Sequence, residues 1–422
     1  MASRITTLAA TAACCALVLA AAGPATAATA TTAATADTAT TAKASDAPSA
    51  GSVAPGQDPF YSAPADIGSY APGQIVATRP VSVTLLGLPT GTDAWQISYR
   101  TNDSHGQPEL TVTTLMVPGG AASGSDRPVV SLQAPEDSTG SQCAPSYTLA
   151  SGTDVADLAD AATLLLKGWA VAVPDFEGPK SVFMAGPQAG HAVLDGIRAV
   201  KNFQDTQDTG IGANSPWALD GYSGGAEATG WAAQLQPSYA PDVRLAGAAM
   251  GGVPADPTAV ARSLDGGAAA GFEMAAAWSI STEFPEVGIP SLLNAQGQQD
   301  FTNTGGKCMT QLLAAYPFKK LSSDTTVPDP LSVPSVAAVL NENRLGTQAP
   351  ATPVYDYHAD TDEIVPVGQD DTLVKDWCAK GATVDEVRDP IGEHVEEAVA
   401  RRLSVLDFLS DRFAGRSADS SC

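Results

Sequence analysis

The sequence predicts an α/β fold in which a mostly parallel central sheet is flanked by helices and carries a mainly helical insertion. First, β-rich or apolar runs alternate with segments of helical periodicity along most of the chain, which is typical of parallel sheets covered by helices. Second, residues 254–345 interrupt this alternation with sequence that contains no convincing strand. Third, 422 residues with 44% hydrophobic content suffice for one large domain, or for one domain with a big insertion.

Three β-rich segments come first and have no helix between them, so they predict an antiparallel edge of the sheet. They are residues 80–88, 94–101 and 110–118. Later apolar runs bounded by turn residues predict buried strands, and segments with apolar residues at helical spacing predict helices. The expected strands are 128–134, 168–174, 217–222, 244–250, 352–357 and 384–388, and the expected helices are 154–166, 189–203, 224–234, 368–380 and 393–413.

The N-terminus predicts export from the cell. Arg4 is followed by a short apolar run and by the small-x-small pattern Ala-Thr-Ala at residues 25–27, which indicates a signal peptide rather than a membrane span. The next stretch is rich in Ala, Thr, Ser and Pro, which is typical of a linker or propeptide. The expected division is a signal peptide at 1–27, the linker at 28–57, the core of the fold at 58–253 and 346–422, and a cap or lid at 254–345.

The net charge of −24 and the isoelectric point of about 4.3 argue against some binding partners but do not identify any. An acidic surface offers phosphate no cluster of Lys or Arg, so we expect no binding of nucleic acid and no stable membrane anchor. No His or Cys pair has the spacing of metal ligands, so we expect neither a metal site nor a cofactor. The oligomeric state is left open.

Four cysteines remain once the signal peptide is removed. An even number in an exported protein favours two disulfides over metal binding, although four cysteines allow three pairings. We favour Cys143–Cys308 and Cys378–Cys422, because the second bond would hold the C-terminus in place.

The pentapeptide Gly221-Tyr222-Ser223-Gly224-Gly225 matches the pattern G-x-S-x-G. It follows an expected strand and immediately precedes an expected helix, which is the setting of the nucleophile elbow in the α/β-hydrolase fold. Gly221 and Gly225 would leave room for neighbouring backbone at the sharp turn. A Gly-rich turn with an incidental serine is the alternative. The strand and helix on either side favour Ser223 as a nucleophile.

A serine nucleophile needs a base, and the chain has four histidines, at positions 105, 191, 358 and 394. The order of this fold is serine, acid, histidine, which leaves His358 and His394 downstream of Ser223. His394 follows the last expected strand and begins the last helix, so we choose it as the base. His358 ends the preceding strand, where we expect it to pack or hydrogen-bond near the acid. His105 and His191 fit solvated turn and helix-cap positions.

The acid is expected in the segment 357–366, which follows a strand and lies between Ser223 and His394. Asp362 is the first choice and Asp360 the second, because a carboxylate here would hold the imidazole tautomer and stabilise the imidazolium. Position alone separates the two poorly.

Several blocks in this order resemble the secretory lipase family of the α/β-hydrolase superfamily, and the likeness runs from about Asp58 to the C-terminus. The blocks are PEDS at 135–138, CAPSY at 143–147, PDFEGP at 174–179, GYSGGA at 221–226 and DEIVP at 362–366. The resemblance implies that Asp362 is the acid of the triad and His394 its histidine. It also implies an oxyanion hole formed by Gly224 and Asp137, although Asp137 alone also fits a helix or turn cap.

We therefore expect a secreted serine hydrolase that cleaves carboxylic esters through an acyl-enzyme. The resemblance implies a triacylglycerol lipase of lipid degradation, acting on lipid esters that include those at an oil–water interface. The alternatives are a short-chain carboxylesterase or acyltransferase, a peptidase, and a binding protein without catalysis. Apolar cap residues would form either the walls of an acyl site or plain cap core: Phe272, Met274, Trp278, Ile280, Phe284, Leu292 and Leu293.

Overall fold

The computed structural model describes residues 49–85, 88–119, 126–203 and 209–422. The expected signal peptide and most of the expected linker lie outside these residues. The last part of that linker is described and already has structure, since Pro55–Gln57 forms a short 3₁₀ helix in which Pro55 is buried.

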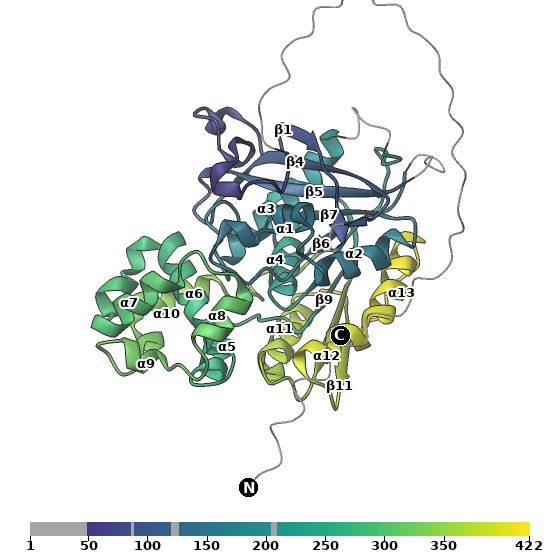
Figure 1. The fold of residues 1–422 in the computed structure, drawn as a ribbon. Helices are drawn as coiled ribbons and strands as arrows, with labels where there is room; N and C mark the ends of the chain where they lie inside the picture. The colour runs from purple at the N-terminus through teal and green to yellow at the C-terminus, as the bar shows by residue number, and fades with distance from the viewer. Residues whose placement is uncertain (1–48, 86–87, 120–125, 204–208) are drawn as a thin grey trace, which may run out of the picture. The chain divides into compact units, whose positions relative to one another are not determined.

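In the described part of the chain, nine strands form one sheet in the order β1-β4-β5-β7-β6-β8-β9-β10-β11 (Figure 1). The first three strands of this order pair antiparallel, β5 pairs antiparallel with β7, and every later pair is parallel. The antiparallel edge joined to a mostly parallel sheet is confirmed. The strands are β1 Ile75–Pro80, β4 Thr92–Asn102, β5 Pro108–Pro118, β6 Val129–Gln133, β7 Ala170–Pro174, β8 Trp217–Tyr222, β9 Leu245–Gly251, β10 Val354–Ala359 and β11 Val384–Asp389.

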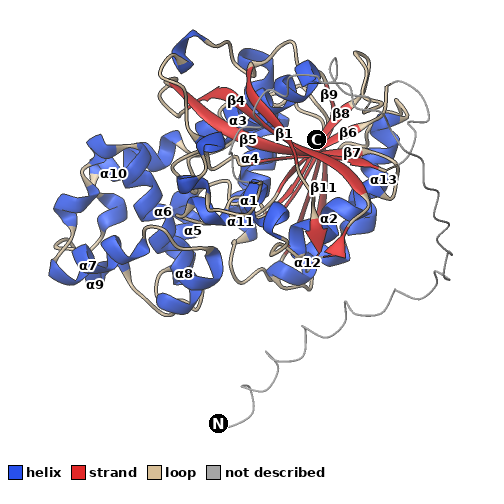
Figure 2. Ribbon diagram, turned by 45° about the horizontal axis from the view of Figure 1, so that its top comes forward, coloured by secondary structure: helices blue, strands red, loops and turns tan. Residues whose placement is uncertain are grey.

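Helices cover both faces of this sheet, which runs between them in Figure 2. Successive residues of a strand point to opposite faces, so Val129 packs into one buried core and Val130 into the other. The first core includes side chains of α3 Gly186–Phe203, α4 Gly224–Tyr239 and α11 Val367–Ala379. The second includes side chains of α2 Ala156–Leu165 and α13 Arg402–Phe413. Burial on both faces explains why the parallel strands read as continuous apolar runs.

The segment expected to form the cap, residues 254–345, lies between β9 and β10 and is described throughout. Its helices gather beside the sheet in Figure 1, and one isolated bridge joins Leu293 to Thr325 in place of any strand. One apolar cluster lies within it, and a second joins its residues to Phe183, Met184 and Val365 of the core. The helices are α5 Pro257–Leu264, α6 Ala270–Glu283, α7 Ala295–Thr304, α8 Met309–Ala315, α9 Leu321–Asp324 and α10 Pro334–Glu342.

Two elements differ from the sequence-based expectation. The strand expected at 80–88 overlaps β1 only at Pro80, where β1 ends, and a hairpin of two-residue strands follows. This hairpin consists of β2 Thr84–Leu85 and β3 Leu88–Pro89. The helix expected at 393–413 is two helices, α12 His394–Ala400 and α13, which separate at Arg401. The guanidinium of Arg401 binds Asp389 at the end of β11 there, a tertiary contact that helical periodicity does not reveal.

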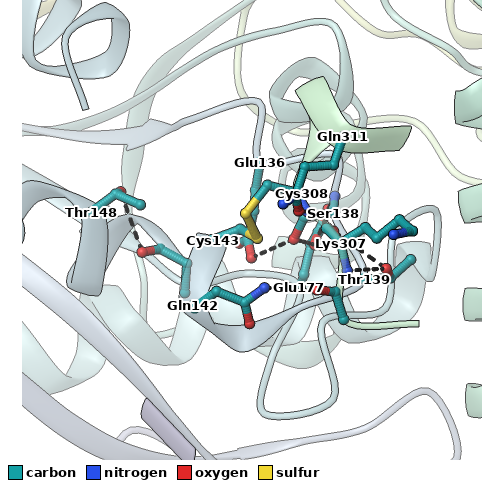
Figure 3. The surroundings of a disulfide bond; sticks show 12 residues. Glu136, Ser138, Thr139, Gln142, Cys143, Thr148, Glu177, Lys307, Cys308 and Gln311 are labelled. Atoms are coloured by element: carbon teal, nitrogen blue, oxygen red, sulfur yellow. Dashed lines mark hydrogen bonds between the residues drawn. A yellow bond between two sulfur atoms is a disulfide. The ribbon is translucent and has the colours of Figure 1, made fainter. Parts of the chain in front are cut away.

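Both expected disulfides are present. Cys378–Cys422 joins the end of α11 to the C-terminus. Cys143–Cys308 joins the segment before α1, Pro145–Ser151, to the cap (Figure 3). The helix α1 was not anticipated.

Candidate active site

Ser223 stands between the end of β8 and the start of α4, above the carboxyl ends of the parallel strands. Its backbone has φ 55° and ψ −124°, a left-handed conformation that a side-chain-bearing residue rarely adopts. A hydrogen bond from Ser223 N–H to the carbonyl of Gly251 on β9, 2.9 Å long, holds this turn. Such strain is typical of functional sites, because the surrounding structure must enforce it.

The neighbouring glycines are required by close approach of backbone. A Cβ at Gly225 would overlap the carbonyl oxygen of Gln133 on β6, and one at Gly221 would overlap the carbonyl oxygen of Gly225. A Cβ at Gly224 would overlap the carboxyl oxygen of Asp137. The small residues of the motif therefore let the first turn of α4 lie directly against the end of β6.

His394 and Asp362 complete a chain of polar contacts that begins at Ser223. His394 Nε2 lies 2.8 Å from Ser223 Oγ, and His394 Nδ1 lies 2.6 Å from Asp362 Oδ2. The other oxygen of Asp362 accepts hydrogen bonds from the backbone N–H groups of Ile364 and Val365, at 2.9 and 2.7 Å. A carboxylate held in this way fixes the ring of the histidine and its tautomer.

The sequence left Asp360 as the second choice for the acid. Asp360 is exposed, and its backbone N–H bonds to Asp389, whereas the Asp362 carboxylate is fully buried. Only Asp362 of the two contacts His394 in the structure.

Two further residues contact His394 and Asp362: Tyr222, and His358, which the sequence placed near the acid. The hydroxyl of Tyr222 donates to the carbonyl oxygen of His394 at 2.5 Å, and the two rings lie 5.1 Å apart. His358 is fully buried between two carboxylates, with Nε2 3.1 Å from Asp362 and Nδ1 2.8 Å from Asp370. Burial alone would lower the pKa of His358, but these two carboxylates raise it to about 10. His358 is therefore a buried cation behind the acid.

Asp137 lies at the other side of Ser223, in the turn that follows β6. It is 3% exposed, its φ is 45°, and its Oδ1 has no hydrogen-bond partner among the described residues. Burial raises the pKa of Asp137 to about 7. Its neighbour Ser138 anchors the turn, because the N–H of Ser138 donates to Glu177 at 3.2 Å and its hydroxyl lies 3.0 Å from Glu136.

An apolar cavity extends from Ser223 into the cap. Of the seven cap residues named from the sequence, Phe272, Ile280, Leu292 and Leu293 line it, and the other three do not. Met274 and Phe284 are instead part of the cap's apolar clusters. Residues of six helical elements of the cap contribute walls: Val260, Leu264, Ala276, Ala277, Ile289, Leu321, Pro330, Leu331, Val336 and Leu340.

The two remaining histidines lie apart from this site. His105 pairs with the exposed Glu286 at 3.3 Å, and His191 stacks on Tyr239 with ring centroids 4.2 Å apart. Asp103, His105 and Glu283 bring possible ligand atoms within 4.8 Å of one another. Backbone N–H groups and Lys180 already bind these carboxylates, so we assign no metal there.

None of the described helices is long and apolar enough to cross a membrane.

The fold and the geometry of the site together define the class of enzyme to which this protein belongs. A strained serine at the elbow of a mostly parallel sheet, with a histidine and a buried aspartate in order behind it, is the arrangement of the α/β-hydrolases. The chain also matches the family model described as Secretory lipase over residues 144–421. This protein belongs to the secretory lipase family, which confirms the resemblance seen in its motifs, and it is a carboxylic ester hydrolase.

Curated relatives and a solved structure agree with this family. Lipase A of Moesziomyces aphidis is 35% identical over 87% of this chain and 82% of the relative. Secreted triacylglycerol lipase LIP2 of Malassezia furfur is 34% identical over 87% and 81%. A Mycobacterium tuberculosis relative, 34% identical over 86% and 83%, is named a probable inactive lipase. The X-ray structure of Candida antarctica lipase A in its closed state has a TM-score of 0.82 and 34% identity, covering 88% of this chain and 89% of that chain.

Proposed function

We propose that Ser223 is the nucleophile of this hydrolase, His394 its general base and acid, and Asp362 the carboxylate that orients His394. The observation that carries the proposal is the continuous polar chain, 2.8 Å from Ser223 Oγ to His394 Nε2 and 2.6 Å from His394 Nδ1 to Asp362. A serine hydroxyl attacks a carbonyl only when an adjacent base takes its proton, and these distances suit that transfer.

The reaction would proceed in two steps through an acyl-enzyme. His394 accepts the proton of Ser223 as its oxygen attacks the ester carbonyl, and then gives that proton to the leaving alcohol. A water molecule, deprotonated by the same histidine, attacks the acyl-enzyme and releases the carboxylic acid. Asp362 stabilises the imidazolium in both steps and keeps its own negative charge.

We assign the oxyanion hole to the backbone N–H groups of Gly224 and Asp137. Gly224 is the first residue of α4, so its N–H has no intrahelical acceptor and lies at the positive end of the helix dipole. The close approach of Asp137 to Gly224 supports the second donor. Removing one such donor costs roughly 2.7–4 kcal/mol of transition-state stabilisation in a comparable hydrolase.

We propose triacylglycerols as the substrate class. The cavity between Ser223 and the cap is lined almost entirely by apolar side chains, which suits a long acyl chain. Relatives named as secreted triacylglycerol lipases support the same class. We further propose that residues 1–27 direct export, that 28–57 form a linker, and that 254–345 act as a cap on a core formed by 58–253 and 346–422, so that the enzyme works outside the cell.

The proposal is tested with Ser223→Ala, measured by hydrolysis of 4-nitrophenyl esters from acetate to palmitate and of emulsified triolein. We expect kcat to fall roughly 10⁴-fold or more, since the attacking oxygen is lost. Ser238→Ala, at an exposed position on the same helix α4, is the matched control and should keep wild-type rates. Unchanged activity in Ser223→Ala overturns the assignment. Activity confined to the shortest esters would make the protein an esterase and not a lipase.

A further inference from the structure

Glu273 is an acidic residue in the apolar wall of the substrate cavity. It lies on α6, is 4% exposed, and lines the same cavity as Ser223. Its Oε1 is buried without a hydrogen-bond partner among the described residues. A buried carboxyl oxygen without a partner is costly, so its presence in a binding cavity needs an explanation.

The helix α6 presents Glu273 to the cavity. Ala276, Ala277 and Ile280 also line the cavity, and they lie three, four and seven positions after Glu273. Residues at this spacing share one face of a helix. Glu273 therefore shares the cavity-facing stripe of α6 with these three residues.

Apolar contacts connect this stripe to the nucleophile. The ring of Phe183 would lie 3.2 Å from a Cβ at Gly224, beside Ser223, and its centroid is 6.3 Å from that of Phe272. Phe272 directly precedes Glu273 on α6 and also lines the cavity. An acyl chain on Ser223 would therefore share one cavity with these two rings and with the carboxyl group of Glu273.

The surroundings of Glu273 favour a neutral ligand group over a cation. Among the described residues that line the cavity, Asp137 is the other ionisable one, and none is Lys, Arg or His. Burial, with the nearby charge of Asp265, raises the pKa of Glu273 to about 9. At neutral pH the group is therefore protonated, so it has one O–H donor and a carbonyl acceptor.

We propose that Glu273 forms a polar subsite for hydroxylated acyl chains, so that this lipase prefers esters whose acyl chain has a hydroxyl group at the depth of α6. This inference rests on the proposed function of Ser223. A hydroxyl group donates and accepts one hydrogen bond each, which satisfies both functions of the neutral carboxyl group. A plain hydrocarbon chain at the same place leaves the carboxyl group unpaired, which a site built for a hydroxyl penalises.

The test compares the 4-nitrophenyl ester of stearic acid with esters of stearic acids hydroxylated at different chain positions. For at least one position we expect the wild-type kcat/KM to exceed that of the plain ester by about tenfold. In Glu273→Leu this ratio should fall to about one, with faster hydrolysis of the plain ester. Glu273→Gln keeps a donor and an acceptor and should keep most of the preference, and thermal unfolding of both variants checks their folding.

Three outcomes overturn the proposal. One is a wild type without preference at any hydroxyl position, and another is a preference that persists in Glu273→Leu. The third is a Glu273-dependent preference for an ester of 12-aminododecanoic acid over the hydroxylated chains, which would make the subsite one for cations. A wild type that hydrolyses no ester at all contradicts the proposed function itself, so the two failures are distinguishable.

Discussion

The chain of polar contacts from Ser223 depends on Asp362, because one of its oxygens binds His394 while the other accepts hydrogen bonds from backbone N–H groups. Burial alone would raise its pKa, but hydrogen bonds from His358 and His394 and from the backbone of Val365 hold the pKa of Asp362 well below its usual range. The carboxylate is therefore ionised at neutral pH, and His394 has a charged acceptor for its Nδ1 proton.

Replacing Asp362 with Asn should lower kcat/KM roughly 10⁴-fold. The neutral amide would favour the wrong tautomer of His394, and it would not stabilise the imidazolium that forms during catalysis. Ester hydrolysis at saturating and limiting substrate measures the loss. Asp360→Asn, two positions away and exposed, is the matched control and should stay within about twofold of the wild type. If Asp360→Asn lost more activity than Asp362→Asn, the acid of the triad would be Asp360 and our assignment of Asp362 would be wrong.

At the scale of single residues, the sequence predicted the residues that a motif or an order of elements can mark. Ser223 was marked by its glycines and its setting, and His394 by its place after the last strand. Asp362 and Asp360 were not separated by position, because burial in a loop depends on contacts far away in the sequence. Glu273 was not anticipated either. Only the structure shows which stripe of α6 faces the cavity.

At the scale of elements, the segment between β6 and α1, residues 134–144, joins the oxyanion side of the site to the cap. Thr139 N–H donates to the carbonyl of Lys307 at 2.9 Å (Figure 3). Gly306 N–H donates to the carbonyl of Thr139, also at 2.9 Å. The Cys143–Cys308 disulfide closes the same contact. The segment that contains Asp137 is therefore held by the cap as well as by the sheet.

Removing this disulfide should affect both stability and catalysis. For the double variant Cys143→Ser and Cys308→Ser we expect the free energy of unfolding to fall by about 2–5 kcal/mol. We also expect kcat to fall about tenfold, because Asp137 is less well positioned against Gly224. Urea unfolding and ester hydrolysis measure the two effects.

The matched control is the double variant Cys378→Ser and Cys422→Ser, which removes the bond between the end of α11 and the C-terminus. It should lose stability and keep its kcat at temperatures where it is folded. Equal losses of kcat in the two double variants would mean that the Cys143–Cys308 bond has no particular role in positioning Asp137.

The elements that the sequence predicted well are the ones whose signal is local. The strand 217–222 agrees with β8 at both ends, because an apolar run bounded by a proline and the elbow marks it. The break between α12 and α13 depends on the contact between Arg401 and Asp389, which are brought together only by the fold. The short helix α1 begins at Pro145, directly after the Cys143 segment, and has too few residues for a periodic signal.

At the scale of the whole molecule, buried titratable groups near the sheet dictate how stability depends on pH. Burial raises the pKa of Asp137 and Asp175 to about 7 and that of Glu109 to about 8. His358, between its two carboxylates, has a pKa of about 10. In each case the folded pKa lies above the unfolded one, so the contribution of that group to stability falls as the pH rises between the two values, which for Asp137 and Asp175 means from 3.8 to about 7.

His358 makes this dependence testable above neutral pH. Its contribution is fully present below the unfolded pKa of about 6.5, shrinks by about 1.4 kcal/mol per pH unit above that, and is lost once the pH passes the folded pKa of about 10. We expect His358→Gln to be less stable than the wild type at pH 6, since the two carboxylates lose their cation, and to show a flatter decline between pH 7 and 9.5. Urea unfolding at several pH values, with disulfides intact, measures both slopes. The control His105→Gln removes a half-exposed histidine and should keep the wild-type dependence of the unfolding free energy on pH. If His358→Gln kept that dependence as well, His358 would be neutral in the folded protein.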